Sequence, residues 1–269
     1  EVVIVGTGTG TATYQWYKST DGKNTGGTEI SGATGKTYTT PATGKADNNT
    51  YYYCVVSNNG GKATSRAAKL TVQYPVVLNG SYPQDTTVVV GKTASFKVSI
   101  SEAGNPASYT YQWYKGTSAG DAGTAIKGAT SDNYQITATT KADNNTYYYC
   151  KVTNAGGTTE SRHAKLTVYY PPVLNSSYPA DATVVIGNKG TFKVAVATAG
   201  NPASYTYQWY QNGTAIQGAT EATYTTVATT KAMNGYTYYC KVSNEAGSVN
   251  SRTAKLTVQY VPVLVNMCF

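Results

Sequence analysis

Charged residues are scarce in this sequence: they make up 13% of its 269 residues, about half of the ~25% usual in soluble domains. Phenylalanine, tryptophan and methionine are also rare, with 3, 3 and 2 copies, whereas tyrosine occurs 26 times and glycine 27 times. A composition rich in Tyr, Thr, Val and Gly and poor in Leu favours pleated sheet, because β-branched and aromatic side chains fit a half-buried strand surface. It excludes a helical bundle and disfavours enzymes of the Rossmann and TIM-barrel types.

Long apolar runs and clusters of positive charge are missing as well. No run approaches the ~20 apolar residues needed to cross a bilayer, so we expect no membrane span. The net charge of +8 is spread along the chain. A nucleic-acid binder is expected to gather Lys and Arg in a patch, so we expect no nucleic-acid partner. The chain starts at Glu1 without an apolar leader, and we interpret it as a mature or excised piece of a longer protein.

Comparison of the chain with itself reveals three copies of one unit. The recurring motifs are Tyr-Gln-Trp-Tyr around Trp16, Trp113 and Trp209, and Tyr-x-Cys at Cys54, Cys150 and Cys240. Successive copies are about 90 to 97 residues apart, which suits a domain and is too long for a solenoid unit. The sequence therefore predicts three domains, at residues 1–73, 74–169 and 170–260, and an apolar tail at 261–269.

Short runs of alternating residues, separated by turn formers, fill each copy. In copy 2, Trp113 and Tyr148 are predicted to face inward, whereas Tyr114 and Tyr149 face outward. Breakers such as Ala-Gly-Asn-Pro, from Ala103, separate the runs. Many short strands with period two and regular turns indicate an all-β sandwich.

The order of these motifs resembles the immunoglobulin fold: a Trp in one strand, then a Tyr two residues before a Cys, then a final Val-rich strand. Phrases such as Thr-Ala-Ile-Lys-Gly-Ala-Thr, from Thr124, look like the tandem immunoglobulin-like repeats of bacterial and phage surface proteins. The resemblance implies three tandem immunoglobulin-like β-sandwich domains in an extended rod. It places the Trp on strand C and the Cys on strand F, and makes Tyr52, Tyr148 and Tyr238 the tyrosine corner. This resemblance is specific evidence for the fold and weak evidence for the function.

Each copy has a single cysteine in its Tyr-x-Cys motif. The strand-B position to which the resemblance would assign a second cysteine is Val98 in copy 2 and Val194 in copy 3. Cysteines of neighbouring domains should lie roughly 30–40 Å apart, beyond the ~7 Å limit between Cα atoms for a disulfide. We therefore expect free, buried thiols that pack on Trp. The missing bridge favours a prokaryotic or viral source.

The two ends of the array differ. Copy 1 opens at residues 1–5, which match the second edge strand of copy 2, so its N-terminal strand A is predicted to be missing. The tail repeats the start of a joint and offers candidate donor-strand residues, namely Val261, Val263, Leu264, Val265 and Phe269. Two interpretations stay open: a window cut from a longer repeat protein, or strand complementation between copies by β-augmentation. The short, Pro-containing joints predict a semi-rigid rod.

We predict no enzyme, no cofactor and no metal site. His163 is the only histidine, and its neighbours Arg162 and Lys165 cannot orient an imidazole as a base. The 13 acidic residues form no recurring pair of the glycosidase kind. Asp85 and Asp181 recur after the joints, but one carboxylate per joint is too few for calcium, and we interpret them as turn or strand-start residues.

Outward positions on the predicted strands C and F form a tyrosine-rich face, which is the one candidate interaction site. Its residues are Gln112, Tyr114, Tyr147, Tyr149 and Lys151 in copy 2, Tyr17, Tyr51 and Tyr53 in copy 1, and Tyr210, Tyr239 and Lys241 in copy 3. Exposed tyrosines can stack on sugar rings or pack against a protein partner. Cross-strand tyrosine pairing explains the same pattern without a ligand. The pattern alone does not separate these interpretations.

The leading hypothesis is a non-catalytic extracellular structural protein: a stalk, appendage or filament subunit at a cell or virion surface. Its partners would be copies of itself or neighbouring domains of the same longer chain. The alternative is an adhesin or phage decoration module that binds glycan or a host surface protein through the tyrosine faces or loops.

Overall fold

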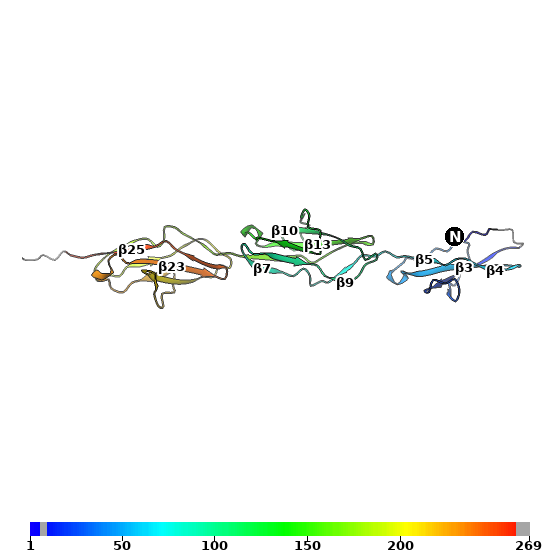
Figure 1. The fold of residues 1–269 in the computed structure, drawn as a ribbon, viewed down its shortest axis with the longest axis horizontal. Coiled ribbons are helices and arrows are strands. Elements are labelled where there is room, and N and C mark those ends of the chain that lie inside the picture. The colour runs from blue at the N-terminus through cyan, green and yellow to red at the C-terminus, as the bar shows by residue number, and fades with distance from the viewer. Residues whose placement is uncertain (6–9, 262–269) are drawn as a thin grey trace, which may run out of the picture.

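The protein is a row of three β-sheet bodies in one extended rod (Figure 1). The computed structural model describes residues 1–5 and 10–261. We keep the boundaries proposed from the repeat and call residues 1–73, 74–169 and 170–260 domains 1, 2 and 3. The prediction of an all-β, tandem architecture is confirmed. In the described part of the chain, no helix is long and apolar enough to cross a membrane.

Domain 2 packs a large sheet against two short strand pairs. The large sheet has the order β11 (Thr124–Ala125), β10 (Thr110–Gly116), β13 (Thr146–Asn154), β15 (Ala164–Tyr169) and β7 (Thr86–Val89), and β14 (Gly157–Glu160) also pairs with β13. The pairs are β8 (Ala94–Lys97) with β12 (Asn133–Ile136), and β6 (Val77–Leu78) with β9 (Ile100–Glu102). All pairings are antiparallel except β7 with β15, which is parallel.

Domain 3 repeats this topology. Its large sheet has the order β17 (Ala182–Val185), β25 (Ala254–Gln259), β23 (Thr237–Asn244), β20 (Thr206–Gln211) and β21 (Thr214–Ala215), with β24 (Gly247–Asn250) on β23. Its pairs are β18 (Thr191–Lys193) with β22 (Thr223–Thr225), and β16 (Val173–Leu174) with β19 (Val196–Thr198). Each domain also has one turn of 3-10 helix, at η1 (Lys45–Asp47), η2 (Lys141–Asp143) and η3 (Lys231–Met233).

Domain 1 has one sheet of the same kind and no second layer of strands within its described residues. The sheet has the order β2 (Thr28–Glu29), β1 (Thr13–Ser19), β3 (Thr50–Asn58) and β4 (Gly61–Thr64), and β5 (Ala68–Leu70) also pairs with β3. Among residues 1–5 and 10–73, no strand corresponds to β6, β7 or β8 of domain 2.

The cores of domains 2 and 3 are centred on a Trp and a Cys that face each other across two strands. Trp113 pairs with Cys150, and both are fully buried. Phe96 lies between Trp113 and Tyr148, with its ring centre 4.7 Å from that of Tyr148. In domain 3, Phe192 lies between Trp209 and Tyr238 in the same way. Domain 1 keeps the pair Trp16 and Cys54 but has no such Phe in its described residues. Its core is therefore open on the side that β8 covers in domain 2.

Two expectations need correction. The Val2 N–H donates to the Lys36 carbonyl, which is the bond that Val98 and Val194 make in their domains. Residues 1–5 therefore follow the path of strand B and not of the second edge strand. The tyrosine corner was also wrong at Tyr238, because its hydroxyl donates to the Gln211 side chain at 3.1 Å and not to the backbone.

Candidate functional site

The joint between consecutive domains is held by an asparagine side chain of the following domain. Asn105 Nδ2 donates to the Val72 carbonyl at 2.6 Å and lies 3.3 Å from Asn48 Oδ1. The second joint repeats both contacts between Asn201, Val168 and Asn144, at 2.8 and 3.3 Å. Since both acceptors belong to the preceding domain, one side-chain amide fixes two domains to each other.

The chain that leaves each domain is itself held in place. Asn48, Asn144 and Asn234 accept, through Oδ1, the N–H of Val72, Val168 and Val258 at 2.9–3.0 Å. A lysine of the 3-10 helix then covers the tyrosine that opens the next segment: Lys45 on Tyr74, Lys141 on Tyr170 and Lys231 on Tyr260, at 4.9–5.1 Å from the ring centres. Cation–π contacts of this kind are worth about 0.5–1 kcal/mol at exposed sites. The joint is therefore a repeated structure and not a free linker.

The motif Ala-Gly-Asn-Pro was predicted only to break strands, and its role at the joint was not predicted. A signal was present, because the motif recurs from Ala103 and Ala199 at the same distance after a joint. Gly104 is required there, since a Cβ on it would lie 2.5–2.8 Å from Asn154 and from the backbone at Pro75 and Val76.

The joint segment continues directly as strand A of the following domain. In domain 2 the Tyr74 carbonyl accepts a bond from Asn154 Nδ2 at 2.9 Å, and the Val76 carbonyl accepts one from Thr159 Oγ1 at 2.6 Å. Val76 is buried, with 1% of its surface exposed, and Leu78 pairs with Ile100. In domain 3, Asn244 donates to the Tyr170 carbonyl at 2.9 Å in the same way.

Domain 1 has a groove where this segment lies in the other domains. The groove has a volume of about 790 Å³ and is lined by residues 2–5, Gly10, Ala12 and the hairpin of β3 and β4 at residues 56–58 and 60–65. Residues 2–5 correspond to the strand-B residues that pair with strand A in domain 2. We call this groove the strand-A slot. The expectation that copy 1 lacks strand A agrees with it.

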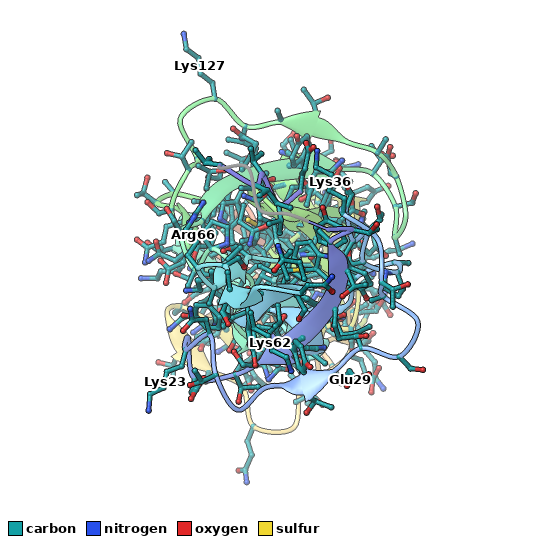
Figure 2. All side chains as sticks on the ribbon, turned by 90° about the vertical axis from the view of Figure 1, so that its right-hand side faces the viewer. Lys23, Glu29, Lys36, Lys62, Arg66 and Lys127 are labelled. Carbon is teal, nitrogen blue, oxygen red and sulfur yellow. The ribbon has the colours of Figure 1, made fainter. Side chains whose placement is uncertain are left out.

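The neighbouring edge of domain 1 is uncovered too. Arg162 and Arg252 form ion pairs with Asp85 and Asp181 at 2.8 and 3.2 Å, next to β7 and β17. Their counterpart, Arg66, is exposed, and none of the carboxylates in the described residues pairs with it. Figure 2 looks at this end of the rod and shows Arg66, Lys23 and Lys62 at its surface.

These ion pairs also explain the recurring aspartates. Asp85 Oδ1 accepts the Lys165 N–H at 3.0 Å and an Arg162 bond at 2.8 Å. The backbone bond and the Arg162 charge lower the pKa of Asp85 below its ordinary value. The Asp85 side chain therefore ties the start of β7 to β15, in line with the strand-start interpretation. In the described ranges, no group of three or more His, Cys, Asp or Glu could hold a metal.

The tyrosine face is built of stacked pairs. Tyr17 stacks on Tyr53, Tyr114 on Tyr149 and Tyr210 on Tyr239, with ring centres 4.7–5.2 Å apart. Lys151 lies 5.0 Å above the Tyr114 ring, and Tyr51 and Tyr147 are half-buried. The Gln112 side chain is hydrogen-bonded within the domain, because its Nε2 donates to two carbonyl oxygens at 2.8–2.9 Å. Lys241 is exposed.

Two members of this face are not exposed, and that part of the prediction was wrong. Tyr149 is 0% exposed and Tyr53 is 3% exposed. The loop after β10 covers Tyr149, whose hydroxyl donates to the Ala122 carbonyl, and the His163 ring stacks on it at 4.1 Å. The Tyr53 hydroxyl accepts the Gly27 N–H in the same position. Whether the remaining residues bind a partner stays a prediction.

His163 holds this loop in place. Its Nδ1 accepts the Gly120 N–H at 3.2 Å, and its Nε2 lies 3.1 Å from Glu160 Oε1. The first bond needs a ring nitrogen without a proton, so the neutral imidazole with a proton on Nε2 fits both contacts. The contacts of this histidine are structural ones.

Cys54, Cys150 and Cys240 are free and buried. Burial raises the pKa of Cys150 to about 12 and that of Cys240 to about 11. At neutral pH these thiols are therefore protonated and behave as small hydrophobic side chains. Of the candidate donor-strand residues, Val261 is 81% exposed, and Val263, Leu264, Val265 and Phe269 lie outside the described residues.

Comparisons with known proteins agree with this fold. Models of immunoglobulin domains match residues 75–154 and 171–258, and a family described as a domain of unknown function, DUF8696, matches residues 2–74. The muscle M-line assembly protein unc-89 of Caenorhabditis elegans is 29% identical over 79% of this chain, and endoglucanase C of Cellulomonas fimi is 30% identical over 66%.

The chain spans only 3% and 16% of the length of these two relatives. Among solved structures, extracellular domains 3–5 of Drosophila OTK cover 93% of this chain at 15% identity, with a TM-score of 0.45 and 86% of that chain covered. The four N-terminal immunoglobulin domains of Dscam1 cover 91% of this chain at 22% identity, with a TM-score of 0.44 and 64% of that chain covered. In fold, the protein is a tandem array of immunoglobulin-like domains.

Proposed function

We propose that this protein is a non-catalytic, extracellular structural protein whose domains form a stiff stalk, appendage or filament subunit. The observation that carries the proposal is the joint, which has the same bonds between domains 1 and 2 as between domains 2 and 3. A spacer that only connects domains needs no such bonds. A joint that repeats them sets one geometry along the whole rod.

The joint resists bending in several places at once. Besides the Asn105 amide, the backbones of Tyr74 and Asn105 exchange two bonds at 2.9–3.0 Å. Lys45 adds an ion pair to Glu102 across the first joint at 3.0 Å. A hydrogen bond contributes about 0.5–1.5 kcal/mol net, so loss of the amide contacts would release the joint without unfolding a domain.

Small-angle X-ray scattering of the whole chain tests the proposal. The wild-type chain is expected to scatter as one straight rod. Asn105→Ala with Asn201→Ala is expected to broaden the distance distribution and shorten the mean end-to-end length. Asn133→Ala, at an exposed position on β12, is the matched control and should leave the profile unchanged. A wild-type profile of freely jointed domains would contradict the proposal.

A bacterial or phage surface is the source that we propose for this rod. The single buried, free cysteine of each domain supports it, because disulfides are usual in immunoglobulin domains of antibodies. One of the relatives, endoglucanase C, is from the bacterium Cellulomonas fimi, whereas unc-89 is from an animal. In such a setting the rods would join end to end through strand complementation.

Adhesion is the second candidate, and the stacked tyrosines favour it. Tyr114 and Tyr210 are half-buried and keep part of their rings open to solvent. They could stack on a sugar or contact a host surface protein. Binding on a glycan array that disappears with Tyr114→Ala and Tyr210→Ala together would support this function. Tyr149 is unsuitable for the test, because its replacement would remove a buried ring.

A further inference from the structure

We infer that the tyrosine stack of domain 3, formed by Tyr210 and Tyr239, binds acidic glycans, whose pyranose rings carry carboxylate groups. The inference rests on the adhesive function proposed above as the second candidate. It names the domain that carries the binding site and the chemical class of the ligand.

Domain 2 shows how the second tyrosine of such a stack is covered. The Tyr149 ring stacks on Tyr114, and the His163 ring stacks on Tyr149 at 4.1 Å. The loop after β10, residues 117–123, adds to the cover, because the Tyr149 hydroxyl donates to the Ala122 carbonyl. A flat ring and a hydrogen-bond acceptor therefore occupy this position and bury Tyr149.

Domain 3 lacks both parts of this cover. Thr253 stands in the position of His163, directly before the residue that opens β25. The connection from β20 to β21 consists of residues 212–213 alone. Tyr239 keeps its stack on Tyr210, with ring centres 4.7 Å apart, and is partly exposed. Among the described residues, none makes a hydrogen bond with the Tyr239 hydroxyl.

The charge beside the stack differs between the two domains as well. In domain 2, Lys151 forms an ion pair with Glu160 at 3.4 Å and lies 5.0 Å from the centre of the Tyr114 ring. The counterparts in domain 3 are Lys241 and Asn250, which are partners across β23 and β24. Lys241 is exposed and has no carboxylate partner within the described ranges. A positive charge without a partner therefore lies next to the uncovered ring.

The outer side of this sheet holds neutral and cationic side chains around Tyr239. Residues two apart on a strand point to the same face, so Thr237 and Lys241 flank Tyr239 on β23. Thr237 is paired with Lys255, which is exposed and forms no ion pair in the part of the chain that the structure describes. The acidic residues of domain 3 lie outside β20, β23 and β25, at Asp181, Glu221 and Glu245.

A carboxylated pyranose suits this arrangement in shape and in charge. The C–H face of a sugar ring can stack on the Tyr239 ring, and a sugar oxygen can accept the bond from its hydroxyl. The carboxylate would meet Lys241 or Lys255 in a charge-assisted bond. This ligand would supply what His163 and Ala122 supply in domain 2, together with the negative charge that Glu160 supplies there.

Two other classes of partner fit less well. A protein interface has an apolar core, whereas the neighbours of the stack on β20 and β23 are Gln208, Thr237 and Lys241. A nucleic acid needs a larger gathering of basic residues than two lysines. The observations therefore favour a glycan.

Rebuilding the domain 2 cover in domain 3 tests the inference while both tyrosines stay in place. Thr253→His supplies the ring that stacks on the tyrosine, and Asn250→Glu supplies a partner for Lys241. We call this double substitution the covered variant. Its matched control is Thr223→His with Asn188→Glu, at exposed positions on β22 and in the turn before β18, with the same change of charge. Circular dichroism verifies that each protein is folded.

A charge variant, Lys241→Gln with Lys255→Gln, removes the two cations and leaves the rings. Isothermal titration calorimetry of the full chain then measures binding of oligogalacturonate and of sialyllactose, and the methyl ester of each probe serves as the uncharged ligand. We expect the wild type and the matched control to bind at least one acidic probe. We expect the covered variant and the charge variant to bind that probe at least tenfold more weakly, and the wild type to bind its ester at least tenfold more weakly. The probe that binds shows whether the carboxylate belongs to a hexuronate or to a sialic acid.

Several results would overturn the inference. These are no binding of either acidic probe by the wild type, equal binding by the covered variant, and equal binding of an acid and its ester. A glycan-array signal for neutral sugars that depends on Tyr114 and Tyr210 would still support adhesion. Straight rods in the scattering experiment would still support the structural function, so the failures are distinguishable.

Discussion

A disulfide engineered into domain 2 tests the architecture most directly. Val98 follows β8 and is 4% exposed, Cys150 on β13 is 0% exposed, and both belong to the core around Trp113. These are the positions at which the immunoglobulin resemblance places the two bridging cysteines. We expect Val98→Cys to form a bond with Cys150 across the two layers, because each side chain points into the same core.

The size of the effect follows from the loop that the bond closes. Residues 98 and 150 enclose a loop of about 50 residues, and the chain-entropy relation gives about 4 kcal/mol of stabilisation for that length. For a domain of this size, 1 kcal/mol corresponds to roughly 4–8 °C in Tm. Domain 2 is therefore expected to melt roughly 15–30 °C higher when oxidised, less whatever strain the bond adds.

Calorimetry of the full chain, oxidised and reduced, measures the shift on one protein. Only the domain 2 transition should move, and the reduced sample should melt close to the wild type. Thiol titration counts the bond independently, since the oxidised variant should lose the Cys150 thiol even after unfolding. If both thiols stay free under oxidising conditions, the two positions do not face each other and the assignment of strands B and F is refuted.

Three further changes have defined outcomes. Phe192→Ala should destabilise domain 3 by about 3–5 kcal/mol, which calorimetry would show as a transition at lower temperature. The fluorescence of Trp209 should change as well, because the Phe192 ring packs on Trp209. A transition that does not shift would contradict the assignment of Phe192 to the core. The pKa of Asp85 is lowered in the folded state by its backbone bond and by Arg162. The stability that the Asp85 carboxylate contributes is therefore fully present above the unfolded pKa of ~3.9, and it is lost as pH falls through the lower folded pKa. Asp85→Asn should accordingly flatten the acid limb of the stability curve, and an unchanged acid limb would show that the bond adds nothing. Cys150, with a pKa of about 12, should resist iodoacetamide at pH 8 and react only after unfolding, as followed by mass spectrometry.

The repeat and its strand alternation predicted the architecture because both depend on local order in the sequence. A period of two places Trp113 and Cys150 on the inner face whatever the neighbouring domains do. The pairing of Trp113 with Cys150 in register then follows from the antiparallel strands that carry them. The same alternation predicted that Cys150 is buried, since it places this residue on the inward side of its strand.

The tyrosine face shows where alternation stops being informative. Period two gives the side of the sheet to which Tyr149 points, and that side was predicted correctly. It cannot say that the loop after β10 folds over this side, because the cover depends on His163 and Ala122, far from Tyr149 in sequence. Exposure is a property of packing between segments, so outward residues need not be accessible ones.

The prediction for the start of domain 1 was wrong for a related reason. Residues 2–5 are apolar and β-branched, and such a segment fits strand B as well as the second edge strand. The choice between them depends on a partner, which is the Lys36 carbonyl in the structure. The joint asparagines were missed because Asn next to Pro is also a common turn signal. Asn105 is identified as a contact between two domains, and not merely as a turn residue, only by the position of Val72 and Asn48 across the joint.

Stiffness and folding are coupled in this rod, because one segment serves as linker and as strand A. Tyr74 is fixed at the joint, and two residues later Val76 is buried in the core of domain 2. Bending at the joint would therefore pull strand A out of its slot, which costs burial of Val76 and the bonds from Asn154 and Thr159.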